Sequence, residues 1–204
     1  MASSETASDR RAFFRRVARK TGETVVRHAD AHVSKRASHW IRPPHALAEL
    51  DFLLACTRCG DCTTACPHNV IFALPTRLGA QIAATPALDL LHRGCHCCSD
   101  WPCAAACESG ALSLPADENG ISSSAPPEIA SAQIDEQLCL AWQGPECGAC
   151  ASACPIDGAL IWQDEKPRID MGYCNGCALC REACLVEPKA ISIRSLSASS
   201  EVAA

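Results

Sequence analysis

The chain has 204 residues, a formal net charge of -5 and only 4% aromatic residues, which excludes a large aromatic core. Much of its 48% apolar content is Ala and Cys, so packing alone supplies little folding energy. With 17 cysteines, metal ligation must supply the rest, and we expect the apo chain to be largely unfolded.

The first 50 residues differ in charge from the rest of the chain. They contain no cysteine and hold ten Lys and Arg against five Asp and Glu, whereas the remaining residues hold eight against eighteen. Residues 9–15 resemble a twin-arginine export signal. Such a signal needs an apolar run after the arginines, and basic residues such as Arg19 and Arg27 interrupt every candidate run. We therefore do not expect export through this signal.

The same stretch fits an amphipathic helix with Phe13, Phe14 and Val17 on one side of a basic surface, or else a solvated tail. We expect residues 1–44 to form a basic arm that is partly helical or disordered. Its charge suits contact with an anionic membrane surface or an acidic partner. We expect no nucleic-acid partner.

The first module is expected over residues 45–114. Residues 41–44 contain two prolines and predict an extended lead-in, which a short helix over 48–54 connects to the first cysteine loop. Apolar residues at 78, 82, 88 and 91 predict a helix broken at Pro86. A closing strand is expected over 110–114.

Residues 115–131 are rich in Ser and Pro and predict a linker. The pattern restarts in a second module over 132–195, followed by a disordered tail over 196–204, so the chain contains an internal repeat. The order of strand, cysteine loop and short helix predicts an α+β fold of two tandem two-cluster bacterial ferredoxin-like modules. Strands of the second module are expected over 132–135, 158–162, 167–170 and 190–193.

Sixteen of the 17 cysteines fall into four runs of four. The first and fourth runs have the spacing C-x2-C-x2-C-x3-C, which is a ligand pattern of bacterial iron-sulfur proteins, and the other two are widened versions of it. The runs are Cys56, Cys59, Cys62 and Cys66; Cys95, Cys98, Cys103 and Cys107; Cys139, Cys147, Cys150 and Cys154; and Cys174, Cys177, Cys180 and Cys184.

Three kinds of site use cysteine at this density: disulfides, structural zinc and iron-sulfur clusters. Disulfides are poorly served by triplets with such close spacing, and no secretory signal indicates an oxidising compartment. Zinc prefers two C-x2-C pairs separated by a longer loop and has no use for the third cysteine of each triplet. The spacing therefore favours four [4Fe-4S] clusters.

In two-cluster ferredoxins the last cysteine of each run binds the cluster of the other run. Short intervals and the linker favour pairing the first run with the second and the third with the fourth, although pairing the first with the fourth is topologically possible. Sequential pairing gives set one, Cys56, Cys59, Cys62 and Cys107; set two, Cys95, Cys98, Cys103 and Cys66; set three, Cys139, Cys147, Cys150 and Cys184; and set four, Cys174, Cys177, Cys180 and Cys154.

Three further residues adjoin the ligand loops. Cys97 has no place in the runs and could be a substitute ligand or a redox-sensitive thiol, but we favour a small buried residue. His68 and His96 are expected in surface or packing roles, because each cluster already has four thiols. No Gly-rich phosphate loop, flavin fingerprint or catalytic triad occurs, so we expect an electron carrier and not an enzyme.

Parts of the chain resemble the NapF ferredoxin-type proteins of bacterial periplasmic nitrate reductase systems. The matching parts are the Ile-Arg-Pro-Pro lead-in at 41–44, the Cys-Thr-Arg-Cys loop at 56–59 and the widened third run from Cys139 to Cys147. The resemblance covers roughly residues 41–195. The second run departs from it, since four residues separate Cys98 from Cys103, as in the electron-wire subunits of molybdenum enzymes.

The resemblance implies a cytoplasmic accessory protein that meets the molybdenum-containing catalytic subunit of a reductase before export. It would supply electrons to that subunit or assist its iron-sulfur cluster. An alternative is an electron-wire subunit between a membrane quinol dehydrogenase and a reductase. An alternative of another class is a zinc-stapled interaction protein, which would be colourless where the others are brown.

Overall fold

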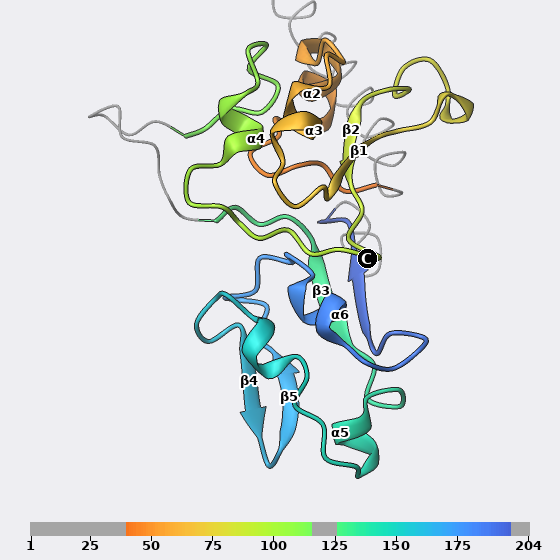
Figure 1. Ribbon diagram of the computed structural model, residues 1–204, viewed down its shortest axis with the longest axis vertical. Coiled ribbons are helices and arrows are strands. Elements are labelled where there is room, and N and C mark those ends of the chain that lie inside the picture. The colour runs from red at the N-terminus through yellow and green to blue at the C-terminus, as the bar shows by residue number, and fades with distance from the viewer. Residues whose placement is uncertain (1–39, 116–125, 197–204) are drawn as a thin grey trace, which may run out of the picture.

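The computed structural model describes residues 40–115 and 126–196. The predicted arm up to residue 39, much of the predicted linker and almost all of the predicted tail lie outside the described residues. The first half of the described chain forms one end of the molecule and the second half the other (Figure 1). No helix in the described part of the chain is long and apolar enough to cross a membrane.

The first half consists of short elements around the cysteine loops. Helix α2 (Glu49–Ala55) is the short helix predicted from the sequence, and its Phe52 is fully buried in the core. The helix ends where Cys56 takes an extended backbone and the first run begins. The other elements are α3 (Asp61–Ala65), β1 (Ile71–Ala73), the 3-10 turn η1 (Thr76–Leu78), β2 (Pro86–Leu88) and α4 (Pro102–Ala105).

Arg42 attaches the lead-in to the first half. Its guanidinium makes a two-point ion pair with Glu49 of α2, at 2.6 and 2.9 Å. It also donates hydrogen bonds to the Thr85 hydroxyl and the Pro86 carbonyl, and it lies over the Phe52 ring. These contacts fix the start of the described chain to α2 and β2.

The helix predicted between residues 78 and 91 is wrong. The chain instead forms the antiparallel pair β1 and β2, with Ile71 opposite Leu88. Pro86 begins β2, because its fixed φ and missing N–H are tolerated at the first residue of an edge strand. The apolar spacing reflects the burial of Ile82 and Leu88 under this small sheet and its loop.

The strand predicted over 110–114 is reduced to one bridge, between Leu112 and Ala46. Gly110, at φ 70°, turns the chain just before this point. The following residues pair only with the short lead-in segment, which is too short to form a ladder.

The second half contains two antiparallel strand pairs. Strands β3 (Ser131–Ile134) and β6 (Ile191–Arg194) pair, so the start and the end of this half lie side by side. Strands β4 (Leu160–Gln163) and β5 (Lys166–Ile169) form the predicted hairpin, which confirms the strands expected here. The helical elements are α5 (Leu140–Gln143), the 3-10 turn η2 (Ala151–Ala153) and α6 (Leu179–Ala183).

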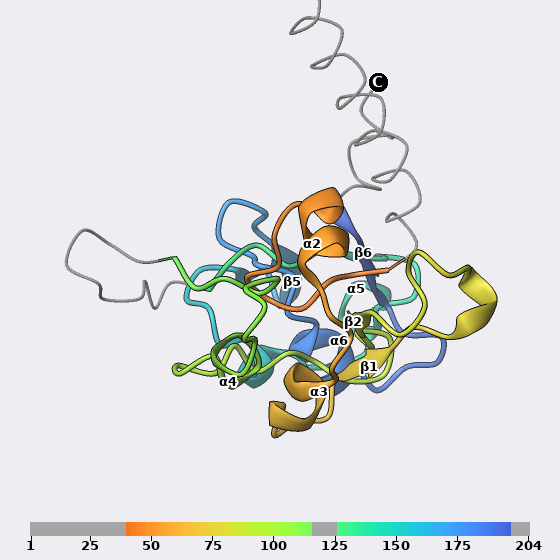
Figure 2. The same ribbon diagram turned by 90° about the horizontal axis from the view of Figure 1, so that it is seen from above.

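The two halves share one hydrophobic core. Ile129 and Ala130, which the sequence assigns to the linker, are buried and donate their N–H groups to the Asn175 carbonyl at 2.7 and 3.3 Å. Gly176 is required at this contact, because a Cβ there would lie 1.9 Å from the Ala130 carbonyl oxygen. Seen from the end formed by the first half, α2, α3 and α4 are spaced around that half (Figure 2).

Candidate metal centres

The run cysteines gather in groups of four thiols. In the first half, burial raises the pKa of Cys62, and the charges of Cys107, Cys56 and Cys59 raise it further. Charges act in this way only on near neighbours, so the four thiols of set one lie near one another.

In set two, too, the charges of neighbouring thiols add to the rise in the pKa of Cys98 and Cys103. Burial, followed by the charges of Cys95 and Cys66, raises the pKa of Cys103 to about 12. Burial also raises the pKa of Cys98, and the charges of Cys95 and Cys66 add to the shift. Cys66 therefore lies with the second run, although it belongs to the first.

Two further groups form in the second half. Burial raises the pKa of Cys150 to about 11 and that of Cys180 to about 12. The charges of Cys139, Cys147 and Cys184 add to the shift of Cys150, and those of Cys177, Cys174 and Cys154 add to the shift of Cys180. These neighbours are the other members of sets three and four. The weaker effect of Cys150 on Cys180 indicates that sets three and four are neighbours.

Two packed helices carry the crossover in the first half. Helix α3 contains Cys62 of set one and ends at Cys66 of set two. Helix α4 packs against it, contains Cys103 of set two and leads to Cys107 of set one. The turn η2 and helix α6 pack in the same way in the second half. The runs are thus brought together in sequential pairs.

Four neighbouring thiols, all but Cys59 of set one at least partly buried, suit a cationic group. Because each thiolate raises the pKa of its neighbours, all four ionise together only when positive charge lies among them. A single zinc ion would hold its sulfurs at about 2.3 Å from the metal. Over residues 40–115 and 126–196, no three His, Cys, Asp or Glu side chains come close enough to hold one ion. The thiols of sets two and three line hollows instead.

These two hollows have a largely apolar lining. The four thiols of set two line one hollow, together with Val70, Leu88 and Trp101. The four thiols of set three line the other hollow, together with Trp162 and Leu185. Apolar walls limit the access of water to a bound cluster and so influence its reduction potential.

Left-handed backbone shapes the cysteine loops. The residue before the second cysteine has a positive φ in three runs, at Arg58, Cys97 and Gly176. Such turns direct successive backbone N–H groups toward one concave side, as in many anion and iron-sulfur sites. The residues that precede the three helices of the loops are also left-handed, and these are Gly60, Trp101 and Ala178.

The loop after Cys107 supplies hydrogen bonds to its sulfur. Burial raises the pKa of Cys107, but hydrogen bonds from its loop outweigh burial and lower it. The Leu112 N–H donates to Sγ at 3.3 Å, and the Ser109 hydroxyl lies 3.6 Å away. Such donors stabilise a thiolate ligand.

Sets two and four meet where the two halves join. The Cys95 N–H donates to the Cys177 carbonyl at 2.7 Å, which links a thiol loop of each half. Cys97 lies between them and accepts a hydrogen bond from the Asn175 amide at 3.1 Å. Hydrogen bonds with Cys177 and then Cys95 raise the pKa of Cys97. The run spacing gives no sign of Asn175, because this contact depends on how the halves pack.

The two histidines flanking these loops stack on each other. The ring centroids of His68 and His96 are 3.6 Å apart with an interplanar angle of 10°. Burial and then the proximity of His96 lower the pKa of His68. Both rings line the hollow of set two. Because this set already has four thiols, the two histidines are expected to pack there and not to act as ligands.

Known proteins similar to this chain are ferredoxin-type proteins. The methylamine utilization ferredoxin-type protein MauM of Methylobacillus flagellatus is 32% identical over 208 residues, which cover 91% of this chain and 83% of MauM. The ferredoxin-type protein NapG of Escherichia coli is 32% identical over 212 residues, which cover 96% and 89%. The ferredoxin-type protein NapF of Escherichia coli is 31% identical over 161 residues, which cover 74% and 84%. No family model and no solved structure matches.

The similarity confirms the ferredoxin-type part of the resemblance drawn from the sequence. It does not support the narrower assignment to NapF, because the similarity to MauM and NapG extends over more of the chain. This chain belongs to the family of ferredoxin-type proteins that includes MauM and NapG.

Proposed function

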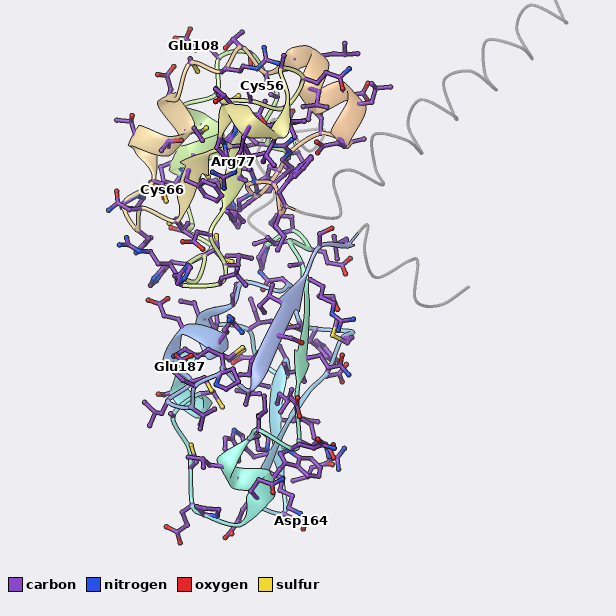
Figure 3. The ribbon with its side chains drawn as sticks, turned by 90° about the vertical axis from the view of Figure 1, so that its right-hand side faces the viewer. Cys56, Cys66, Arg77, Glu108, Asp164 and Glu187 are labelled. Carbon is purple, nitrogen blue, oxygen red and sulfur yellow. The ribbon has the colours of Figure 1, made fainter. Side chains whose placement is uncertain are left out.

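We propose that this chain carries four [4Fe-4S] clusters, one in each set of four thiols, and transfers electrons between two redox partners. The observation that carries the proposal is the order of the sets along the molecule. Sets two and four meet at the backbone hydrogen bond from the Cys95 N–H to the Cys177 carbonyl. Set one begins with Cys56, directly after α2, and set three begins with Cys139, directly before α5, at the opposite ends of the molecule (Figures 1 and 3).

Burial of the thiols supports this order. Of the eight cysteines in the inner sets two and four, five are buried, whereas only Cys62 is buried among the eight of the outer sets one and three. Cys59 of set one is exposed. A protein that exchanges electrons at both ends needs its outer centres near the surface and its inner centres shielded from water.

The sixteen thiols would hold the clusters, and other residues of the chain would set their surroundings. Each [4Fe-4S] cluster, when bound, supplies one-electron oxidation and reduction. The apolar walls around sets two and three exclude water, and donors such as the Leu112 N–H stabilise the ligand sulfur.

A second candidate is the accessory role, in which the chain meets the molybdenum-containing catalytic subunit of a reductase in the cytoplasm. It is favoured by the similarity to NapF, which spans 74% of this chain. For that role one exposed set of thiols would be enough to contact the catalytic subunit, and four sets in a row would be unnecessary.

Metal content tests the cofactor assignment directly. Anaerobic reconstitution of the full chain should give about sixteen iron and sixteen acid-labile sulfide per chain, at four of each per cluster. Stoichiometric zinc without colour would support the interaction protein, and iron near eight would contradict half of the ligand sets.

Partner capture separates the two roles. The full chain with an affinity tag is isolated anaerobically from separate cytoplasmic and membrane fractions of its own cells. The two-partner proposal expects both a quinol-oxidising membrane protein and a reductase. Recovery of only a molybdenum-containing subunit, from the cytoplasm, would favour the accessory role.

A further inference from the structure

Two of the four tryptophans have an indole N–H that finds no acceptor among residues 40–115 and 126–196. Trp40 donates to the Glu49 carboxylate at 3.3 Å, and Trp142 donates to the Pro167 carbonyl at 3.1 Å. The Nε1 atoms of Trp101 and Trp162 are buried and have no partner in the part of the chain that the structure describes.

The same two tryptophans line the thiol hollows. Trp101 lines the hollow of set two, and Trp162 lines that of set three. Neither Trp40 nor Trp142 lines either hollow. A buried donor without an acceptor is unfavourable, so each of these two indoles, which line the thiol hollows, needs an acceptor that the described residues do not supply.

Trp101 occupies its place against a backbone preference. Its φ is 44°, in the left-handed region that non-glycine residues rarely adopt, and its side chain is only 3% exposed. It is one of the four residues that separate Cys98 from Cys103, where the first run has only two. The widened loop therefore carries this indole into the wall of the hollow.

We propose that the indole N–H groups of Trp101 and Trp162 donate hydrogen bonds to the sulfur of the clusters held by set two and set three. This inference rests on the proposed function, since the acceptor is a cluster. A hydrogen bond to cluster sulfur stabilises the reduced form, which carries one more negative charge, and thereby raises the reduction potential. Trp101 and Trp162 are then positioning and tuning residues, because neither supplies a ligand.

The test replaces each tryptophan with phenylalanine, which keeps an aromatic ring and removes the donor. Trp101→Phe and Trp162→Phe are compared with Trp40→Phe and Trp142→Phe, the matched controls whose donors have protein acceptors. The full chain is reconstituted anaerobically, its iron and sulfide are measured, and all clusters are titrated by electron paramagnetic resonance. Trp101→Phe should lower the potential of one cluster and Trp162→Phe that of a different cluster, while the controls leave all four unchanged.

A second measurement covers variants that lose iron. In the loaded wild-type protein with 15N-labelled tryptophan, the indole N–H signals of Trp101 and Trp162 should show larger hyperfine shifts than those of Trp40 and Trp142. Full iron content with unchanged potentials in Trp101→Phe and Trp162→Phe, or four indole signals without this difference, would overturn the inference. Wild-type protein without iron-sulfur clusters would instead overturn the proposed function.

Discussion

The side-chain amide of Asn175 donates a hydrogen bond to the sulfur of Cys97, at 3.1 Å, across the contact between the two halves. The carbonyl oxygen of the same amide accepts the Cys177 N–H at 3.2 Å. Asn175 is 6% exposed, so both bonds are shielded from water. One side chain thus fixes the loop of set four against the loop of set two.

Asn175→Ala should destabilise the loaded protein by about 2 kcal/mol, because it leaves the Cys177 N–H unpaired inside the core. Its iron content should stay at the wild-type value, since Asn175 supplies no ligand. Denaturant unfolding of the reconstituted protein measures the first effect. The control is Gln143→Ala, which removes an exposed amide bound to the Glu136 carbonyl and should change stability by less than about 0.5 kcal/mol. Equal stability of the two variants would contradict the role of Asn175 in fixing the two loops against each other.

Pairs of cysteine variants test the crossover between runs. Cys66→Ala should remove the cluster of set two, about four of sixteen iron. Adding Cys103→Ala should cause little further loss, because both thiols belong to set two. Adding Cys62→Ala to Cys66→Ala should remove a second cluster, because Cys62 belongs to set one although it lies in the same run.

Iron and sulfide analysis of the reconstituted variants gives the measurement, and Cys97→Ala is the control that should keep all iron. Crossover would be refuted if the Cys66 and Cys62 variants together lost only one cluster. Loss of iron in Cys97→Ala would mean that Cys97 is a ligand.

Gly176→Ala should prevent the halves from packing correctly. A Cβ at this position would lie 1.9 Å from the Ala130 carbonyl oxygen, and the φ of 74° is strained for alanine. We expect loss of the cluster of set four together with a cost of more than about 3 kcal/mol, which exceeds that of left-handed strain alone.

Gly60→Ala is the matched control, because Gly60 is also left-handed and precedes a helix in a cysteine loop, yet has nothing within 4 Å of its Cβ position. It should cost only about 1–2 kcal/mol and keep all iron. Similar losses in both variants would place the cause in the φ angle and not in the contact with Ala130.

The cysteine spacing alone was enough to predict four ligand sets, because ligand geometry depends on short intervals within each loop, and these sets stay a prediction. The assignment of Cys66 and Cys107 to opposite sets follows from the crossover rule, and in the structure Cys107 neighbours Cys62 while Cys66 neighbours Cys103. The hairpin of β4 and β5 was predictable for a similar reason, since strand and turn residues follow one another directly.

Contacts between distant segments could not be predicted in this way. The apolar spacing around Leu88 resembled a helix, but those residues are buried by a two-strand sheet and its loop. Asn175 and Trp101 carry no motif, and their roles depend on the packing of the halves and on the wall of a hollow. In a single sequence, the residues that make such long-range contacts are isolated polar or aromatic residues without a recognisable pattern.

The last prediction concerns the arm, where residues 1–50 carry ten Lys and Arg against five Asp and Glu. Deletion of residues 1–39 should leave about sixteen iron per chain, because no cysteine lies there. The deletion ends before Trp40, which donates a hydrogen bond to Glu49, and so preserves this contact.

The same deletion should weaken association with anionic vesicles or with an acidic partner, because the remaining chain is itself acidic. Binding of the full and truncated proteins is measured on vesicles containing phosphatidylserine and on neutral vesicles, at low and high salt. The difference should be largest on anionic vesicles at low salt and should fall as salt screens the charges. A full chain in which the arm basic residues are replaced by glutamine controls for chain length and should bind like the truncated protein. Equal binding of all three proteins at every salt concentration would show that the arm has no role in docking to a membrane surface.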